Sequence, residues 1–283
     1  MRVFLLSLIA GCGSSMQAVD LPPTGHEGVA SPEATPSPDP HAEALEIARQ
    51  DHDEHHWGYE GDESPDKWGS LDEHYRVCGG GPFQSPIALT STGTSVHHET
   101  LHLEYAPAEF HAVNNGHTIQ LNCEHDEDYL QLNGHPYKLI QGHFHAPSEH
   151  TVNGEQFPMA LHLVHLDEYD HIAVVGIPIR VGAENAVLKP IFDELPAKKG
   201  DRIDHPEIKL DLPNLVANEK QFFHYLGSLT TPPCTENVQW LFMESPIEVS
   251  QAQLDAFVAV IGKNARPIQP GNQRMITHDE ATN

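Results

Sequence analysis

Residues 141–150 read QGHFHAPSEH, a stretch that brings three histidines and one glutamate within a few positions of one another. Imidazole binds transition metals and exchanges protons near neutral pH, and carboxylates orient both kinds of group. The stretch therefore fits three descriptions: a metal site, a catalytic base with its supporting groups, or surface histidines in a chain that contains 22 of them.

His143 and His145 have the spacing of two ligands on one strand. Successive side chains of a strand point to opposite faces, so these two imidazoles share a face. The run ALHLVHL, further along the chain, offers a third ligand from a neighbouring strand, either His162 or His165. These two histidines are three residues apart and point to opposite faces, so only one of them can join the pair. Three histidines with one open coordination position are typical of a catalytic zinc site.

Short alternating runs predict the strands that must hold such a site. The runs with strand character are LHLEY (101–105), TIQLN (118–122), YLQL (129–132), YKLI (137–140), ALHLVHL (160–166) and HIAVVGIPI (171–179). Asn133-Gly134 separates two of these runs and predicts a tight hairpin. The clearest helix signal begins at Ser250, which can form a capping box with Gln253, and Gly262 lies near the expected end. We therefore expect a β-rich domain with few helices.

The chain of 283 residues carries a formal charge of −26, from 15 Lys and Arg against 41 Asp and Glu. Phosphate backbones and anionic lipid headgroups repel such a chain, so we expect no nucleic-acid partner. Acidity also favours solubility, which is the simpler explanation for it. The four cysteines, Cys12, Cys78, Cys123 and Cys234, are too few and too scattered for a disulfide scaffold or a Cys-rich zinc finger.

The first residues, MRVFLLSLIAGC, contain one basic residue and then an apolar run from Val3 to Ala10. This run is too short to span a bilayer and fits a short signal-peptide core. Ile9-Ala10-Gly11-Cys12 resembles a bacterial lipoprotein box, in which the cysteine is lipidated. The alternatives are a plain signal peptide cut nearby and a poorly ordered start. We expect a lipoprotein-type signal peptide over residues 1–11, a lipid on Cys12, and a location outside the cytoplasm, in the periplasm or cell envelope.

The segment that follows is poor in large apolar residues and rich in Pro, Ser, Thr and Ala, as in SPEATPSPDP (31–40). Such a segment cannot bury enough apolar surface to offset the entropy lost on ordering. We therefore expect an acidic, Pro/Ser-rich, disordered linker over residues 12–52. The membrane contact that we expect is the lipid at its first residue.

Several separated motifs, the histidine cluster among them, resemble the alpha-class carbonic anhydrases. They occur in the family's order: HHWGY (55–59), Cys78-x-x-Gly81-x-x-Gln84-Ser85-Pro86-Ile87, NNGHT (114–118), QGHFHAPSEH, LHLVH, SLTTPP (228–233), Trp240, and Asn264 with Arg266-Pro267. The resemblance covers residues 54–277. It implies a predominantly β (mixed α+β) fold: a single domain over residues 53–280, built on a large central, mostly antiparallel twisted β-sheet with short peripheral helices.

The activity that the resemblance implies is reversible hydration of carbon dioxide to bicarbonate and a proton, by attack of zinc-bound hydroxide on CO2. The implied cofactor is Zn2+, with His143, His145 and His162 as ligands. Gln141 matches the group that holds the first ligand, and the backbone carbonyl of Asn264 would hold the second. His165 would then lie on the opposite face of its strand, and His150 would be a structural histidine.

The chain departs from the family beside the third ligand. The family usually has a Glu two residues before it, and this sequence has Ala160. Residues two apart in a strand share a face, so the missing carboxylate would have been a neighbour of His162. Loss of such a partner costs roughly 10–100-fold in metal affinity or activity, which brings the retention of zinc into question.

The resemblance also implies roles for residues around the metal. Thr230 would donate a hydrogen bond to Glu149 and orient the nucleophile, and His117 would carry protons to solvent. Without the resemblance, the TTPP sequence reads as a rigid turn, Glu149 as a surface acid and His117 as an exposed turn residue. The positions that match the family's apolar CO2 wall are Val164, Val174, Leu229 and Trp240, and Thr231 matches a product contact. Cys78 and Cys234 match a pair that is bridged in secreted members of the family.

Two other functions remain open at this point. One is a catalytically weak or silent carbonic-anhydrase-like binding module, although silent relatives usually lose a zinc histidine and all three are present here. The other is an extracytoplasmic metal-buffering protein, which the many histidines and acids suggest. Buffering predicts several weakly bound ions per chain, whereas the enzyme predicts one tightly bound zinc.

Overall fold

The computed structural model describes residues 40–49, 56–92, 94, 99–123, 128–216 and 221–281. They lie in one compact unit that begins at Pro38. The predicted signal peptide and Cys12 lie outside the described residues. Among the residues described, no helix is long and apolar enough to cross a membrane.

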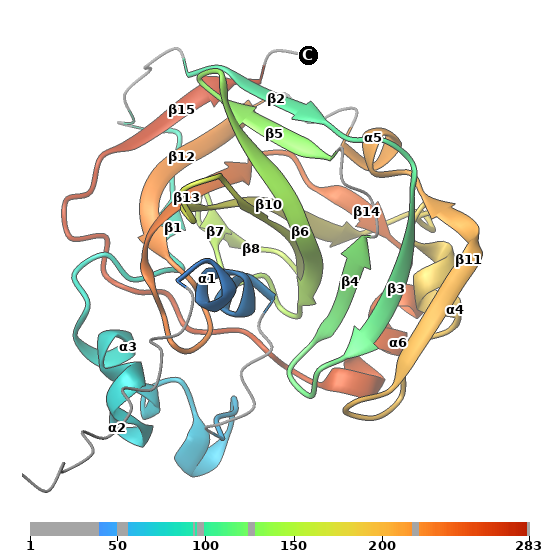
Figure 1. The fold of residues 1–283 in the computed structure, drawn as a ribbon, viewed down its shortest axis with the longest axis horizontal. Helices are drawn as coiled ribbons and strands as arrows, with labels where there is room; N and C mark the ends of the chain where they lie inside the picture. The colour runs from blue at the N-terminus through green and yellow to red at the C-terminus, as the bar shows by residue number, and fades with distance from the viewer. Residues whose placement is uncertain are drawn as a thin grey trace, which may run out of the picture. The chain divides into compact units, whose positions relative to one another are not determined.

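A twelve-stranded, mostly antiparallel β-sheet forms the centre of this unit (Figure 1). Its strands are β2 (Leu101–Glu104), β3 (Ala108–Asn114), β4 (Ile119–Cys123), β5 (Tyr129–Leu132), β6 (His135–His145), β9 (Met159–Leu166), β10 (Ile172–Val181), β11 (Arg202–Leu210), β12 (Gln221–Ser228), β13 (Glu236–Met243), β14 (Ile247–Val249) and β15 (Ile276–Glu280). The main path runs β11-β3-β4-β6-β9-β10-β13-β12-β15, and β10 pairs in parallel with β13 and β14. This architecture confirms the predicted fold class.

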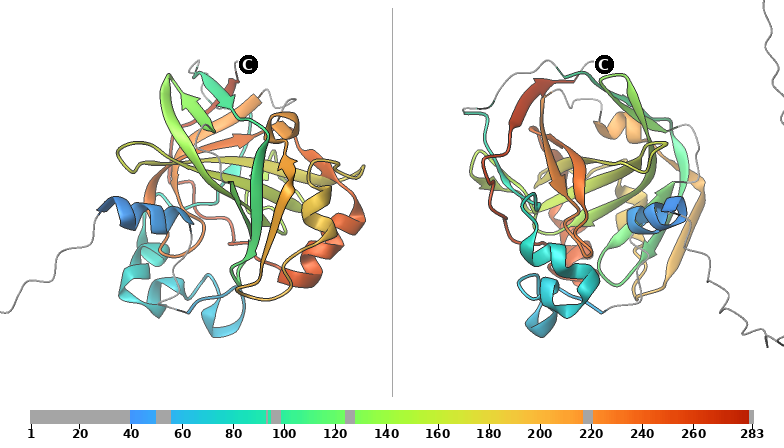
Figure 2. Two further views of the ribbon diagram at one scale, coloured as in Figure 1. Left: turned by 45° about the vertical axis from the view of Figure 1, so that its right-hand side comes forward. Right: turned by 60° about the vertical axis from the view of Figure 1, so that its left-hand side comes forward.

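The remaining elements are short and lie around the large sheet, as the two turned views show (Figure 2). A second sheet of three strands consists of β1 (Ala88–Leu89), β7 (Thr151–Val152) and β8 (Glu155–Gln156). The helices are α1 (Pro40–Arg49), α2 (Trp68–Leu71), α3 (Arg76–Gly80), α4 (Lys189–Asp193), α5 (Leu212–Val216) and α6 (Gln251–Ile261), with 3-10 turns at Gly61–Glu63 and Glu73–Tyr75.

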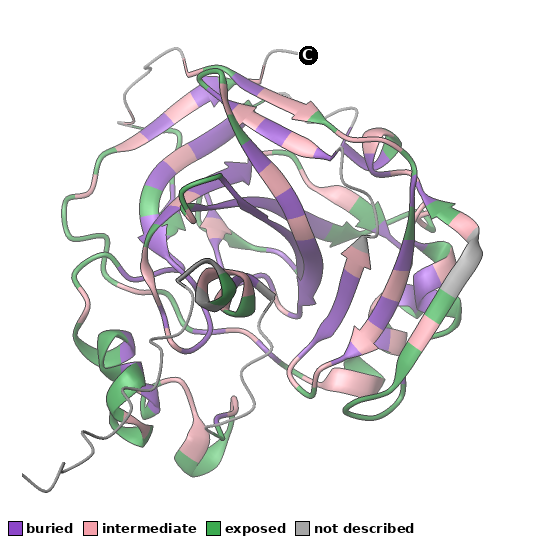
Figure 3. Ribbon diagram, viewed as in Figure 1, coloured by how far each residue is buried: buried purple, intermediate pink, exposed green. Residues whose placement is uncertain are grey.

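Both faces of the central strands are covered, so β9 is buried along its whole length (Figure 3). Leu161 and Leu163 pack into one hydrophobic cluster, with Phe144 of β6. Val164 packs into a second cluster with Val174 on the other face. Because side chains alternate along a strand, the second face is also the face of His162.

Two local predictions are confirmed. Asn133 and Gly134 have φ angles of 54° and 78° and join β5 to β6, which is the left-handed backbone that an Asn-Gly hairpin turn requires. Helix α6 begins with the predicted capping box between Ser250 and Gln253, and Gly262 ends it with a φ of 81°.

Helix α1 lies inside the segment predicted to be a disordered linker, so the prediction is wrong for its residues. Ala48 is 1% exposed, and Leu45 and Ile47 pack with it against the second hydrophobic cluster. The average composition of residues 12–52 conceals this apolar group. Its burial against the sheet supplies the stabilisation that an isolated ten-residue helix lacks. The rest of the linker lies outside the described part of the chain.

Cys78 and Cys234 form a disulfide, with 5.1 Å between their Cα atoms. Cys234 follows the SLTTPP segment directly, and Cys78 lies in α3. The bridge therefore ties the loop that contains Thr230 to the helices before the first strand. This is the pairing that the family resemblance implied.

Candidate metal centre and active site

A β-bulge in β6 determines which side chains reach the site. Leu139 pairs with His165 in β9, but Gln141 pairs with Val164, so the register shifts by one residue at Ile140. The shift turns Gln141, His143 and His145 toward one face while Leu139 packs into the cluster on the opposite face. Bulges often re-aim side chains beside functional sites in this way.

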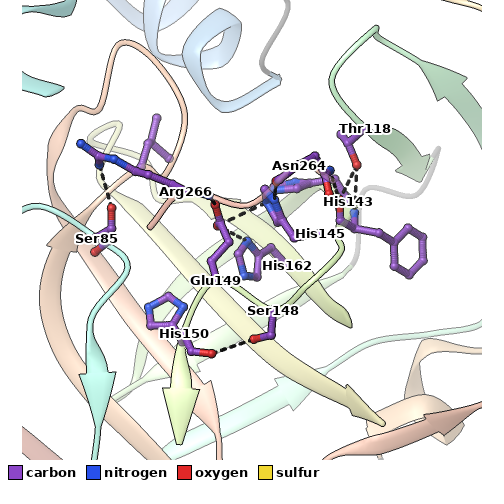
Figure 4. A network of polar contacts seen from close by, with 12 residues as sticks. Ser85, Thr118, His143, His145, Ser148, Glu149, His150, His162, Asn264 and Arg266 are labelled. Atoms are coloured by element: carbon purple, nitrogen blue, oxygen red, sulfur yellow. Dashed lines mark hydrogen bonds and ion pairs between the residues drawn. The ribbon is translucent and has the colours of Figure 1, made fainter. Parts of the chain in front are cut away.

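Beyond the bulge, His143 lies directly opposite His162. These two imidazoles and that of His145 converge, and each of the three offers a ligand atom within 4.8 Å of the other two (Figure 4). All three side chains are buried, at 1–2% exposure. Among the described residues, this is the one group of histidines, cysteines and acids that meets the spacing of a metal site.

Hydrogen bonds fix the orientation of two of the imidazoles. The His143 ring donates from Nδ1 to Gln141 Oε1 over 2.9 Å, and the His145 ring donates from Nδ1 to the Asn264 carbonyl over 2.7 Å. Both acceptors are carbonyl oxygens, so the proton lies on Nδ1 and each Nε2 keeps a free lone pair. Both Nε2 atoms are buried without a hydrogen-bond partner among the described residues. Buried lone pairs in this state require an explanation, and a bound metal supplies one.

Burial also keeps the ligands in the form that binds metal. Desolvation, with repulsion from His145 as a second cause, lowers the pKa of His143 and of His162 well below the ordinary value. Both rings are therefore neutral at pH 7, and a neutral imidazole has a lone pair to donate. The donor set, its burial and the charge state of these two rings fit zinc.

The carboxylate of Glu149 lies next to His145 and His162. Its Oε1 accepts a 2.8 Å hydrogen bond from the Arg266 backbone N–H, and its Oε2 lies 3.5 Å from His145 Nε2. Burial raises the pKa of Glu149, while His145, the Thr230 side chain and Arg266 oppose that rise. The structure thus brings Thr230 and Glu149 together, as predicted.

An apolar wall lies next to the metal position. A cavity of about 10 Å3 is lined by His143, His162, Val164, Val174, Leu229, Thr230 and Trp240. All four residues predicted to form the CO2 wall are in this set. Thr231 is not in it: its side chain is buried, and its carbonyl accepts a hydrogen bond from Cys234 N–H.

Residues 63–280 match the family model described as eukaryotic-type carbonic anhydrase. The chain belongs to this family. It is 39% identical over 223 residues to a carbonic anhydrase of Neisseria gonorrhoeae, which covers 78% of this chain and 87% of the relative. The family is the one that the order of the sequence motifs indicated.

Solved structures give the same result. The alpha-carbonic anhydrase of Thermovibrio ammonificans, in complex with the inhibitor sulfanilamide, is 39% identical with a TM-score of 0.75, over 79% of this chain and 99% of that one. Dioscorin complexed with ascorbate is 30% identical with a TM-score of 0.74, over 80% of this chain and 99% of that one.

Two further histidines, His150 and His165, take no part in the triad. His150 and His165 are buried and bond instead to Tyr225 and Tyr105, over 2.6 and 2.9 Å. Burial lowers the pKa of each of these two histidines to about 3. Both are therefore neutral residues of the scaffold; this agrees with the face argument for His165 and with the role that the family resemblance implied for His150.

His117 stacks flat on Trp57, with ring centroids 3.7 Å apart and planes 6° apart. Its carbonyl accepts a hydrogen bond from the side chain of Asn264, whose own carbonyl holds His145. Asn264 therefore links this segment to the triad. Sequence reasoning did not anticipate Trp57 as the partner of His117, although the HHWGY motif contains it.

The third imidazole of the candidate metal site, that of His162, is held less well than the other two. His162 makes no side-chain hydrogen bond to any described residue, its Nε2 is buried and unpaired, and its Nδ1 lies 4.0 Å from Glu149 Oε2. Ala160, two positions earlier on the same face, is fully buried and contributes a methyl group where the family has a carboxylate. No described side chain has replaced that missing partner.

We predict that Ala160→Glu slows zinc loss to a chelator by roughly 10–100-fold, because a carboxylate would fix the His162 ring and raise its basicity. Release of zinc to dipicolinate from the loaded protein measures this. Ala160→Gln is the matched control, since it adds a similar side chain without the charge and should have a smaller effect. Equal release rates for the Ala160→Glu variant and the wild type, at equal thermal stability, would contradict the prediction.

Proposed function

We propose that this protein catalyses the zinc-dependent, reversible hydration of carbon dioxide to bicarbonate and a proton. The observation that carries the proposal is the convergence of three buried imidazoles, two with unpaired Nε2 atoms, beside a cavity with an apolar wall. Membership of the family and the carbonic anhydrases among its relatives support the same reaction.

His143, His145 and His162 would hold the ion. Zinc bound to three imidazoles lowers the pKa of a coordinated water to about 7, which supplies a nucleophile at neutral pH. The protein would fix the tautomers of two ligands. Gln141 and Asn264 accept hydrogen bonds from the Nδ1 atoms of His143 and His145, which directs each Nε2 toward the ion.

Thr230 and Glu149 would orient the attacking oxygen. An ionised carboxylate only accepts hydrogen bonds, so the Thr230 hydroxyl must donate to Glu149 and is left as an acceptor toward the nucleophile. Arg266 N–H donates to Glu149 Oε1 and so helps to hold the carboxylate in place. Carbon dioxide is small and apolar, so the wall of Val164, Val174, Leu229 and Trp240 would hold it by contact alone.

We predict that His143→Ala abolishes stoichiometric zinc and CO2 hydration, because one of two fully oriented ligands is lost. Zinc content and stopped-flow hydration of the same samples measure this. His165→Ala is the control: it removes a histidine from the opposite face of β9 and should keep one zinc per chain. Near-stoichiometric zinc without hydration in the wild type would favour the silent binding module, and several weak ions per chain would favour metal buffering.

His117 is the proposed proton shuttle, and its test depends on the buffer. We predict that His117→Ala lowers the maximal hydration rate in dilute buffer and that added imidazole restores it, because a small base replaces the lost carrier. A general base of this kind is worth roughly 10²-fold or more. His102→Ala, in β2, is the control. A loss of rate that concentrated imidazole does not restore would contradict the shuttle.

We also propose that the protein lies outside the cytoplasm with a lipid on Cys12. The apolar start of the chain, the IAGC sequence and the disulfide between Cys78 and Cys234 support this, since disulfides persist in oxidising compartments. Mass spectrometry of protein purified from membranes should detect an acylated N-terminal peptide that begins at Cys12. An unmodified Cys12 in the mature chain would contradict the proposal.

A further inference from the structure

Helix α1 packs on the face of the sheet that contains the triad. It contacts β6 and β9, the two strands that provide the three histidines (Figures 1 and 2). Ala48 is buried in the same hydrophobic cluster as the CO2 wall residues Val164, Val174 and Trp240, and Leu45 and Ile47 pack against that cluster. The helix therefore covers apolar surface next to the cavity that substrate would have to enter.

A hydrogen bond joins the end of the helix to a residue that orients a ligand. The Gln141 Nε2 group donates to the carbonyl of Ala48 over 3.0 Å, while Gln141 Oε1 accepts from His143. Ala48 lies in the last turn of α1, where backbone carbonyls have no partner within the helix. One side-chain amide thus satisfies the end of α1 and orients a metal-binding imidazole at the same time.

Little free space remains beside the triad when α1 is in this position. Each of the seven residues that line the cavity is no more than 4% exposed, and the cavity itself, at about 10 Å3, holds about one water molecule. Carbon dioxide and bicarbonate are both larger than water. Neither can be exchanged with solvent at useful rates unless part of this cover moves.

Helix α1 is held less firmly than β6 and β9, the strands it covers. Helix α1 has ten residues, which is marginal for an isolated helix, and a small group of apolar side chains and the bond from Gln141 contribute to its docking. By contrast, β6 and β9 are bonded on both sides within the sheet. Segments with few buried contacts open at the lowest cost in free energy.

We propose that α1 is an intramolecular inhibitory segment that closes the mouth of the active site, so that hydration proceeds in the fraction of molecules in which α1 has undocked. This inference rests on the proposed hydration activity. The measured rate then equals the rate of the open form multiplied by its population, and a helix docked nine-tenths of the time lowers activity about tenfold.

Ala48→Glu in the full chain tests the proposal. The new carboxylate would be buried without a partner in the docked state, so the undocked state is favoured. We expect kcat/KM for CO2 hydration, measured by stopped flow, to rise by about tenfold, and zinc removal by dipicolinate to become faster. Ala42→Glu is the matched control, because Ala42 is exposed on the same helix and should behave as wild type.

The direction of the change separates inhibition from a purely structural role. If α1 merely supported Gln141, its displacement would disorient His143 and lower kcat/KM. A fall in kcat/KM, or equal kcat/KM and zinc-removal rates in both variants and wild type, would overturn the proposal. Faster zinc removal without hydration in any form would instead overturn the proposed function and leave the closing role of α1 standing.

A second route avoids any substitution in the helix. A protease site introduced between Gln50 and Trp57 allows α1 to be severed from the folded domain after purification. Cleavage should raise kcat/KM as Ala48→Glu does, and loss of amide protection in α1 itself by hydrogen exchange would report the departure of the helix. Unchanged activity after complete cleavage and removal of the peptide would also overturn the proposal.

Discussion

The pairing of β6 with β9, and the bulge at Ile140 within it, is the constraint on which the site depends. Without the register shift, His143 would lie opposite Leu161, and the two strands would direct their histidines to different faces. With it, three imidazoles share one face of a sheet whose backbone is hydrogen-bonded on both sides. The candidate metal centre is therefore built into the core of the domain.

Around that pairing, several buried polar groups are held by residues whose own positions are fixed by other parts of the chain. Asn264 follows α6, and it joins the triad to the His117 segment through both its backbone and its side chain. Arg266 holds Glu149 and also bonds to the Cys78 carbonyl in α3. The disulfide then connects α3 to the loop of Thr230. Separate segments of the chain thus converge on the same cluster of atoms.

Sequence reasoning predicted the strands near the site, the hairpin, helix α6 and the face that each histidine occupies, because these follow from local periodicity and turn chemistry. It did not predict the bulge, since a one-residue shift leaves no trace in an alternating pattern that is apolar on both faces. It also missed the docking of α1, because the apolar residues Leu45, Ile47 and Ala48 are few and the composition around them is acidic. Their partner surface is formed by strands more than ninety residues away, such as β6, where Gln141 bonds to Ala48.

The uneven support of the three ligands follows from the same architecture. His143 and His145 are fixed by acceptors from β6 itself and from the segment after α6. The neighbour available to His162 on its own strand is Ala160, which has no polar atom to offer in its side chain. A local change at one position of a strand therefore weakens one ligand without disturbing the other two.

Strand β9 is buried on both faces, and this gives it an unusual intolerance of changes in length. His162 belongs to the candidate metal-binding group and His165 bonds to Tyr105 on the opposite side, so the two faces of the strand carry different chemistry. Deletion or insertion of a single residue within the strand would exchange these faces and leave a leucine at the metal and an imidazole in the core. Natural variants of this chain should therefore differ in length in the connections between strands, and hardly at all between Met159 and Leu166.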